Sequence, residues 1–296
     1  HTVRQRYHVI RAKQVVLATG AHERLIAFPG NDVPGVMLAS AAETMVRRFA
    51  VTPGRRAVLF TNNDEAYGAA AALKAAGVAI AAVVDARSTS ARAQELSGLS
   101  IEVMQGAKVA GVNGGRSVEG VLVRQASGST RSLPCDLVLM SGGHNPAVEL
   151  ASHTRAPLKW NETLAAFVPG TPIAAERSAG AARGVFGIRA AAEDGVAAGR
   201  AAAQACGLTA PASVALPEIA DPPSAPVEAC WEVKGEGGKG PKSFVDLQHD
   251  VTADDMRLAV REGYTDIQHA KRYTTHGMAT DQGKTGGLVG AALVAE

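Results

Sequence analysis

The chain has 296 residues, enough for two domains, and 46% of them are hydrophobic while only 4% are aromatic. Its formal net charge of +2, with the basic residues scattered, argues against a nucleic acid or an anionic membrane as a partner, and no apolar run approaches the ~18 residues of a membrane span. We therefore expect a cytoplasmic α/β protein in which abundant alanine and glycine residues allow close helix–sheet contacts.

Three cysteines are spread along the chain, at Cys135, Cys206 and Cys230, without CxxC spacing. This spacing favours reduced thiols in the cytosol over a disulfide framework. The sequence opens at His1, in an alternating strand pattern and without a methionine, so we expect an internal piece of a longer polypeptide.

The first predicted elements are a short buried strand and a βαβ unit. The run "QVVLAT" at 14–19 predicts the strand, which a glycine closes, and two Pro-Gly pairs then mark a loop. In the βαβ unit, a strand over 57–60 leads to a helix over 65–76 that another glycine ends, and the returning strand covers 78–86. This order is typical of a parallel sheet.

Further along, alternating residues with glycine at the turns predict an antiparallel meander over 101–131. The run "CDLVLMSGG" at 135–143 is another strand followed by glycine, and 184–207 predicts a strand that leads into a long alanine-rich helix. Between 210 and 242 the composition shifts to proline, glycine and charge, which is typical of a linker. The remainder, 243–296, is expected to be a separate small helical module, whose helices begin at two capping pairs, Thr252 with Asp255 and Thr265 with Gln268.

The sequence "VVLATGAHER" ends a hydrophobic strand in Thr19-Gly20-Ala21. Glycine at such a strand end lets the backbone approach a dinucleotide, although a strand-end glycine in a plain α/β core is an equally good interpretation. The second strand-to-glycine run at 135–143 and the helix start in "GVFGIRAAAEDG" add to the pattern, because a helix N-terminus can face phosphate or ribose groups. This order resembles the flavoproteins with two dinucleotide-binding domains, one of which interrupts the other.

That resemblance implies an α/β fold in which an interrupted dinucleotide-binding domain of the FAD/NAD type holds an inserted, degenerate Rossmann-like domain. The expected boundaries are 1–30 and 132–209 for the first domain, 31–131 for the inserted domain, 210–242 for the linker and 243–296 for the helical module.

The inserted unit lacks the glycines of a GxGxxG fingerprint, since Thr61, Asn63 and Ala66 stand at those positions. Side chains there would hinder a pyrophosphate. Asp85 ends the second strand, where a ribose-binding carboxylate belongs, but without the glycines we expect a solvated strand-end aspartate. The inserted domain is thus predicted to keep its fold without strong affinity for a nucleotide.

The last segment, "FVDLQHDVTADDMRLAVREGYTDIQHAKRYTTHGMATDQGKTG", resembles the bacterioferritin-associated-ferredoxin-like [2Fe–2S] domain. Asp246 and Gln248 stand at the first two cysteine positions, and the later pair falls on Asp281 and about Gly286. None of these residues is a thiolate ligand, so we expect no iron–sulfur cluster and no metal.

A cysteine-free version of this module after a flavoprotein-like domain is a feature of the α subunits of heterotetrameric sarcosine oxidases. The stretches "ATGAHERLIAFPGNDVPGVMLASAAE", "TNNDEAYGAA" and "KRYTTHGMATDQGKTG" all resemble that family. The resemblance implies that the α subunit binds NAD, while the β subunit carries FAD, the sarcosine site and a covalently attached FMN near the α–β boundary. The complex, with γ and δ subunits as well, converts sarcosine, tetrahydrofolate and O2 to glycine, 5,10-methylenetetrahydrofolate and H2O2.

Carried onto this chain, the resemblance implies two sets of contact residues. The residues expected to touch NAD are Thr19, Gly20, Ala21, Ala181, Phe186, Gly187 and Ile188. Plain core packing is an equally good interpretation of Phe186 and Ile188. The expected lining of the FMN-side interface is Lys271, Arg272, Thr274, Thr275, Gln282 and Lys284, for which ordinary surface charge is the commoner explanation.

No catalytic residues emerge from the sequence, because the eight histidines are dispersed and none has metal-ligand spacing. We expect the bond-making chemistry on the partner β subunit. Two alternatives stay open: a self-contained NAD(P)H-dependent flavoprotein reductase, which predicts a working second GxGxxG, and the α subunit of a related amine or opine dehydrogenase, which predicts four cluster cysteines. Another secondary amine could replace sarcosine without a trace in this chain.

Overall fold

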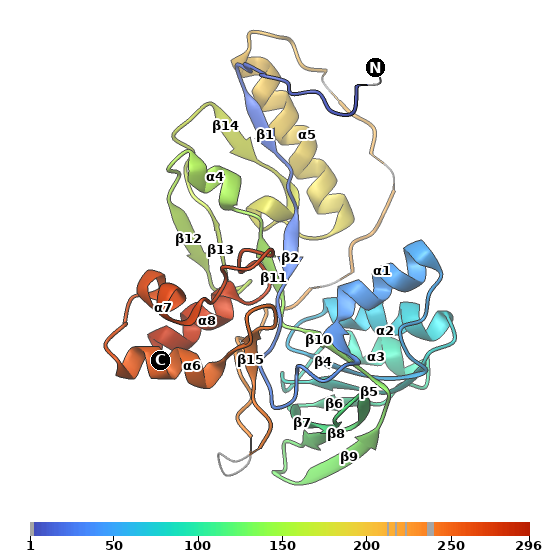
Figure 1. Cartoon of the computed structure of the whole chain (residues 1–296). Coiled ribbons are helices and arrows are strands. Elements are labelled where there is room, and N and C mark those ends of the chain that lie inside the picture. The colour runs from blue at the N-terminus through green and yellow to red at the C-terminus, as the bar shows by residue number, and fades with distance from the viewer. Residues whose placement is uncertain (1–2, 212, 217, 223, 236–239) are drawn as a thin grey trace. The chain divides into compact units, whose positions relative to one another are not determined.

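The computed structural model describes residues 3–211, 213–216, 218–222, 224–235 and 240–296 (Figure 1). The chain divides into two compact units. The first unit comprises His1–Ala21, Pro146–Asn161 and Phe167–Pro222, and the second unit comprises His22–Asn145, Glu162–Ala166 and Pro223–Glu296. The predicted linker over 210–242 includes residues 212, 217, 223 and 236–239, which lie outside the described residues. The predicted domain boundaries differ from these two units and stay a prediction.

The second unit is built on a five-stranded parallel sheet. Its strands, in spatial order, are β3 (Val36–Leu38), β10 (Leu137–Ser141), β4 (Arg56–Thr61), β5 (Ala79–Asp85) and β6 (Val103–Gln105). Helix α2 (Glu65–Ala75) connects β4 to β5, which confirms the predicted βαβ unit. The other helices of this part are α1 (Ala39–Phe49) and α3 (Ala93–Ser97).

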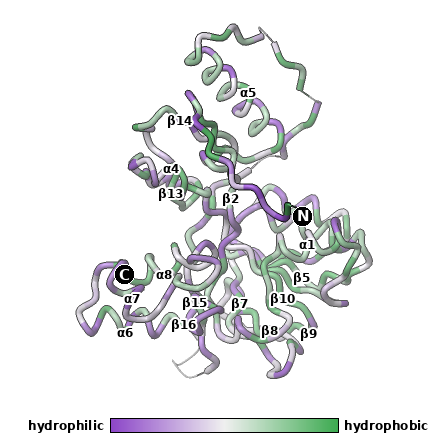
Figure 2. Tube along the Cα trace, turned by 45° about the horizontal axis from the view of Figure 1, so that its top comes forward, coloured by the Kyte–Doolittle hydropathy of each residue, from purple (hydrophilic) through white to green (hydrophobic). Residues whose placement is uncertain are grey.

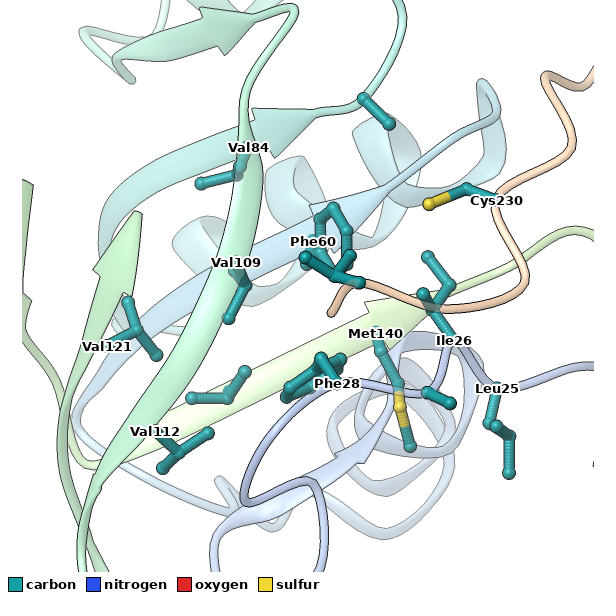
Figure 3. Packing of buried hydrophobic residues seen from close by; sticks show 14 of the residues in the cluster. Leu25, Ile26, Phe28, Phe60, Val84, Val109, Val112, Val121, Met140 and Cys230 are labelled. Atoms are coloured by element: carbon teal, nitrogen blue, oxygen red, sulfur yellow. The ribbon is translucent and has the colours of Figure 1, made fainter. Parts of the chain in front are cut away.

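Both faces of the sheet are covered, as a parallel sheet requires. One face packs on the buried residues of α1 and α2, such as Ala42 and Leu73. Against the other face lies a second cluster, in which the rings of Phe28 and Phe60 meet edge to face with centroids 5.8 Å apart (Figure 3). The strands around β5 and β10 are correspondingly hydrophobic in Figure 2.

An antiparallel meander of β7 (Lys108–Gly114), β8 (Val118–Arg124) and β9 (Thr130–Pro134) confirms the pattern predicted over 101–131. The strand that follows it, β10, was expected in the first dinucleotide-binding domain and instead lies inside the five-stranded sheet, between β3 and β4. All five of its residues are buried, so it needs a neighbour on each edge and cover on both faces.

The C-terminal part of the second unit contains a hairpin and three helices: β15 (Phe244–Asp246), β16 (Val251–Thr252), α6 (Ala253–Arg261), α7 (Ile267–Thr274) and α8 (Gly287–Ala295). The predicted capping box at the start of α6 is confirmed, whereas α7 is capped by Asp266 and not by Thr265. Helix α8 was not predicted.

This C-terminal part was expected to be a separate module, but it shares its core with the sheet. Val245, Met256 and Leu293 belong to the same hydrophobic cluster as Phe60. Two residues of the predicted linker, Cys230 and Val233, are buried in that cluster as well. Cys230, Trp231 and Val233 therefore pack as core and do not behave as a solvated connection.

The first unit pairs β1 (Val15–Leu17) in parallel with β14 (Glu176–Ser178) and carries the long helix α5 (Ile188–Ala205). A 3-10 turn, η1 (Gly180–Arg183), precedes α5, so the strand predicted at the start of 184–207 is wrong. The remaining short elements are β2 (Ala21–Glu23) paired with β11 (His144–Pro146), α4 (Glu149–His153), and β12 (Leu158–Asn161) paired with β13 (Ala166–Pro169). In the part of the chain that the structure describes, no helix is both long and apolar enough to cross a bilayer.

Candidate functional site: two strand ends and a hairpin module

The first candidate site lies at the carboxyl ends of β1 and β14. The two strands run in parallel with Leu17 opposite Ser178, so the segments that leave them start at the same level. The backbone N–H of Ala179 donates to the Leu17 carbonyl at 2.9 Å. The structure thereby brings the Thr19-Gly20-Ala21 segment close to the turn that carries Ala181.

The backbone around Gly20 is open. Gly20 has φ +76°, which favours glycine, and a Cβ added there would meet no atom within 4 Å. Its carbonyl accepts from the N–H of Ala147 at 2.9 Å, and the hydroxyl of Thr19 donates to the Ala147 carbonyl at 3.1 Å. The strand end is therefore anchored on one side while Gly20 keeps space for an approaching group.

The N-terminus of α5 already holds an anionic group from the chain itself. The carboxylate of Asp221 accepts from the backbone N–H of Ala190 at 2.9 Å and of Arg189 at 3.0 Å. These N–H groups hold the pKa of Asp221 below its usual range. Gly187 lies against the same carboxylate, whereas the side chain of Ile188 is 69% exposed and Phe186 is half-buried. A dinucleotide phosphate would have to share or replace this position.

A second candidate site lies between β4 and β10, where the order of the five-stranded sheet reverses. Asn63, at a former glycine position, donates to the carbonyl and the hydroxyl of Ser141 at 2.9 and 3.1 Å. Its side-chain carbonyl accepts from the N–H of Glu65 at 2.9 Å, at the first residue of α2. One side chain thus bridges the two strand ends and occupies the helix start on which a pyrophosphate would rest.

An ion network buries the charges of this second site. Arg87 bonds to Asp64 at 2.7 Å and to Asp85 at 2.8 Å, and the side chains of the three residues are 6%, 8% and 0% exposed. Tyr67 donates to Asp85 at 2.7 Å. Burial disfavours the charge on Arg87, but the bonds to Asp85 and Asp64 outweigh it and raise its pKa. Asp85 is therefore neither the solvated aspartate that we expected nor free for a ribose.

The third candidate site is the pair of loops that resembles a cluster site. The carboxylate of Asp246 accepts three backbone N–H groups, from Gly277 at 2.8 Å, Gln248 at 2.9 Å and His249 at 3.1 Å. Burial opposes the charge, yet these N–H groups win and lower the pKa of Asp246. The carboxylate of Asp281 binds its own loop in the same way. The two carboxylates thus bind main-chain N–H groups of these loops.

One of the four positions compared with cluster cysteines has no room for a side chain. A Cβ added at Gly286 would overlap the carbonyl of Val245, so no cysteine can stand there without a backbone shift. Within the described part of the chain, no group of three or more His, Cys, Asp or Glu residues could hold a metal ion.

A buried histidine in these loops was missed by the sequence reasoning. His276 is 1% exposed, and neither ring nitrogen reaches a hydrogen-bond partner at normal geometry within the described residues. Its ring lies so close to Gly290 on α8 that a Cβ there would clash. Burial lowers the pKa of His276, against the opposing charge of Asp246. The ring is covered by α8, a later helix of the chain, so no local sequence pattern pointed to its burial.

The predicted FMN-side residues lie on α7 and the loop after it. The hydroxyl of Thr274 donates to the Ala270 carbonyl at 2.8 Å, Arg272 to the Gln268 carbonyl at 3.0 Å, and Gln282 to the Ala279 carbonyl at 2.7 Å, so these three have partners inside the module. Gly277 and Gly283 approach so closely that a Cβ on either would lie 3.2 Å from the other's Cα. This approach gathers Lys271, Thr275 and Lys284 near the same two loops; their contact with a flavin stays a prediction.

Arg24 is a second buried residue that the sequence did not identify. Its buried guanidinium donates to the side chain of Asn145 at 3.0 Å and to the carbonyls of Ala165 at 2.8 Å and Leu164 at 3.1 Å, and it lies 5.2 Å from the ring centroid of Trp231. Burial lowers its pKa to about 10. Nothing in "AHERLI" distinguishes this arginine from a surface residue, so only the structure reveals it.

Comparison with known proteins gives these sites a context. A family model described as the sarcosine oxidase A3 domain matches residues 240–296. The chain is 38% identical over 304 residues to the α subunit of sarcosine oxidase from Corynebacterium sp. (strain P-1), covering 99% of this chain and 31% of the relative. It is 36% identical to the corresponding protein of Rhizobium meliloti (strain 1021), covering 100% of this chain and 29% of the relative. The chain thus spans about a third of the length of these relatives.

More distant matches agree on the fold. The A subunit of opine oxidase from Agrobacterium tumefaciens (strain Ach5) is 32% identical over 192 residues, which cover 57% of this chain and 38% of the relative. Among solved structures, L-proline dehydrogenase from P. horikoshii superposes with a TM-score of 0.67 at 21% identity, covering 96% of this chain and 53% of the other. T. acidophilum thioredoxin reductase superposes with a TM-score of 0.50 at 17% identity, covering 66% and 64%. At these identities, the two structures show the fold alone.

Proposed function

The chain is a homologue of the sarcosine oxidase α subunits over its whole length, and on this premise we propose that it is the NAD-binding, structural part of such a subunit in a cytoplasmic complex. The complex would convert sarcosine, tetrahydrofolate and O2 to glycine, 5,10-methylenetetrahydrofolate and H2O2, together with β, γ and δ subunits. The bond-making chemistry and the flavins FAD and FMN would belong to the β subunit. The single observation that carries the proposal is the 36–38% identity along the whole chain.

We assign NAD to the strand ends of β1 and β14. The residues that would hold it are Thr19, Gly20 and Ala21 on one side and Ala181 and Phe186 to Ile188 on the other. The open backbone at Gly20 supports this assignment, because a pyrophosphate can approach there without meeting a side chain. NAD would act as a resident ligand there, since no residue with a catalytic partner lies on these segments.

The C-terminal part would serve as a docking surface beside the β subunit. Its loops hold two carboxylates at positions where the resemblance would place thiolates, which supports a role other than electron transfer through iron and sulfur. Lys271 and Arg272 are the cations that could meet a flavin phosphate at that boundary, with Thr274, Thr275, Gln282 and Lys284 nearby.

The two alternative functions have less support. A self-contained NAD(P)H-dependent reductase needs a second nucleotide site, but the strand end of β4 is closed by Asn63 and the Arg87 network. The similarity to the A subunit of opine oxidase keeps a related amine or opine oxidoreductase as the second candidate. An electron-carrying cluster would distinguish it, and the positions of Asp246 and Gly286 argue against one.

The test is to identify the nucleotide that the chain carries. The full-length chain would be purified alone and with its β-type partner, denatured, and analysed for released nucleotide by mass spectrometry and for iron and acid-labile sulfide. We expect about one NAD for each α chain and no iron. A Gly20→Val variant should release at least about tenfold less NAD, while the control Gly199→Ala, which meets no atom within 4 Å, should be unchanged. FAD on the α chain, or iron with sulfide, would overturn the proposal.

A further inference from the structure

The crevice between β4 and β10 is where an open parallel sheet normally binds its ligand. The order of the strands reverses there, and the chain leaves both strands at their carboxyl ends, through Asn62–Asp64 and Gly142–Gly143. In doubly wound folds, nucleotides lie in this crevice, with the pyrophosphate on the first strand-to-helix turn. Whatever occupies this place determines whether the inserted sheet can bind a nucleotide.

The occupant is a segment of the same chain. Residues 224–235, here called the latch segment, reach the crevice through three hydrogen bonds. The N–H of Ala225 donates to Asp64 Oδ2 at 2.7 Å, the side-chain amide of Asn62 donates to the Glu228 carbonyl at 2.6 Å, and the N–H of Glu228 donates to the Asn62 carbonyl at 3.2 Å. The latch segment therefore bonds to the turn after β4 through its main chain, as a ligand would.

The latch segment then enters the core. Cys230 lies in the same hydrophobic cluster as Ile26 and Phe60 (Figure 3), and burial raises the pKa of its thiol to about 11. The N–H of Ala27 donates to the Trp231 carbonyl at 3.0 Å, and the N–H of Val233 donates to the Ala27 carbonyl at 2.8 Å. The latch segment is thus fixed at both ends, on the turn after β4 and beside Ala27.

The carboxylates of the crevice are partnered within the chain itself. Asp64 and Asp85 bond to Arg87, Arg92 donates to the Asp64 carbonyl at 3.0 Å, and the Asp64 carboxylate also accepts a neutral N–H from Ala225. The bonds to Arg87 and Ala225 outweigh burial and lower the pKa of Asp64, so the carboxylate stays charged. A pyrophosphate would meet two carboxylates there, whereas a backbone N–H meets a partner.

We propose that the inserted sheet is a receptor for its own chain: the latch segment permanently occupies the former dinucleotide crevice and ties the C-terminal part to the sheet. This gives a physical reason for a Rossmann-like unit to keep its fold after losing its glycines. The inference does not depend on which cofactor the first unit binds, so the NAD experiment and the one below can fail separately.

The thiol of Cys230 provides the test, because it can react only when the latch segment opens. The full-length chain would be treated with iodoacetamide, and the alkylation rate of each cysteine followed by peptide mass spectrometry. We expect Cys206, which is partly exposed, to react quickly and Cys230 slowly in the native protein. Added NADH or NADPH should leave the Cys230 rate unchanged.

Two variants loosen the latch segment without touching its core residues. Asn62→Ala removes the bond to the Glu228 carbonyl. Ala225→Pro removes the N–H that Asp64 accepts, because proline has no backbone N–H. Each should raise the Cys230 rate about tenfold or more. The exposed Asn113 supplies the control, and Asn113→Ala should change nothing.

The buried Cys135, in the same hydrophobic cluster, reports on general unfolding. A rise at Cys230 with Cys135 still slow supports the proposal, in either variant. Three outcomes would overturn it: Cys230 as reactive in the native protein as in urea, both variants without effect on Cys230, or a Cys230 rate that NADH or NADPH changes in the native protein.

Discussion

Two strand ends of this chain, one in each unit, have the position of a dinucleotide site, and they differ in what fills them. After β1, Gly20 has open space, and the neighbouring helix start donates its N–H groups to the carboxylate of Asp221. After β4, the first N–H of α2 is bonded to Asn63, and Asp64 and Asp85 are bonded to Arg87 and to the latch segment. A sheet can therefore keep the form of a nucleotide-binding fold while its polar groups bond to one another, and we propose the strand end with free backbone as the nucleotide site.

The loops of the C-terminal part resemble the strand end after β4, because their polar groups are also bonded within the chain. Asp246 and Asp281 accept the backbone N–H groups of the loops, and His276 fills the space between β15 and α8. Both filled sites contain an aspartate carboxylate that accepts main-chain N–H groups. Substitutions that remove a charged side chain, or that add a methyl group at a strand-end glycine, should therefore change stability differently at the filled sites and at the open one.

The largest effect is expected from Arg87→Met, which leaves Asp64 and Asp85 buried without their cation. Removing one partner of a buried ion network costs about 3–5 kcal/mol, so the free energy of unfolding should fall by that amount. Urea denaturation followed by circular dichroism would measure it. The control is Arg131→Met, whose ion pair with Glu102 lies at the surface and should leave stability unchanged. Equal effects of the two variants would contradict the network's role.

A smaller, pH-dependent effect is expected from Asp246→Asn. An amide cannot accept all three N–H groups, so the variant should lose about 1.5–3 kcal/mol at pH 7. Because the folded pKa of Asp246 lies below its ordinary value of about 3.9, the carboxylate contributes its full stabilisation above that value and loses it as the pH falls further. The gap between native protein and variant should therefore narrow as the pH falls below that ordinary value.

Urea titrations at a series of pH values would show this closing gap. The matched control is Asp250→Asn, on the same hairpin, where the side chain is exposed and asparagine also tolerates the left-handed backbone. A gap for Asp246→Asn that stays constant down to pH 2 would refute the explanation.

The smallest effects come from one methyl group at each strand end. Gly142→Ala places a Cβ 2.7 Å from the Leu25 carbonyl and should cost about 1–3 kcal/mol, because the backbone on both sides is fixed. Gly20→Ala meets no atom and should cost only about 1 kcal/mol, from its positive φ. Thermal and urea denaturation of the pair would measure the difference, and a larger loss for Gly20→Ala would mean that the first strand end is not open.

The sequence predicts single helices and strands better than it predicts which segments pair or pack with them. The βαβ unit and the meander follow from alternation and glycine positions, which are local signals, and so does the capping box of Thr252 and Asp255. The position of β10 in the five-stranded sheet was not predicted. A strand whose residues are nearly all apolar has the same sequence pattern in either domain, so the pattern does not assign it to one of them. The burial of Cys230 was not predicted either. The composition of 210–242 is dominated by proline, glycine and charged residues, and this average hides the few residues that pack in the core.

For the sites, the sequence shows directly that the GxGxxG glycines are absent. It does not show which side chains occupy the space at the strand end. Asp85 pairs with Arg87, two residues further along the chain. This pairing depends on the directions of both side chains after the strand ends, which the sequence does not give. His276 and Arg24 are buried by segments far away in the sequence, so no local pattern marks them.

The guanidinium of Arg24 has a consequence for the order of folding. Its hydrogen-bond partners lie 118 to 141 residues further along the chain, and Trp231, over which it stacks, follows later still. Contacts of such sequence separation form late, after long loops have closed, and a buried charge without them would be expensive. During synthesis the second unit therefore has to wait for residues 164–165 before it can enclose Arg24, and the five-stranded sheet reaches its final packing only when the ribosome has released the latch segment.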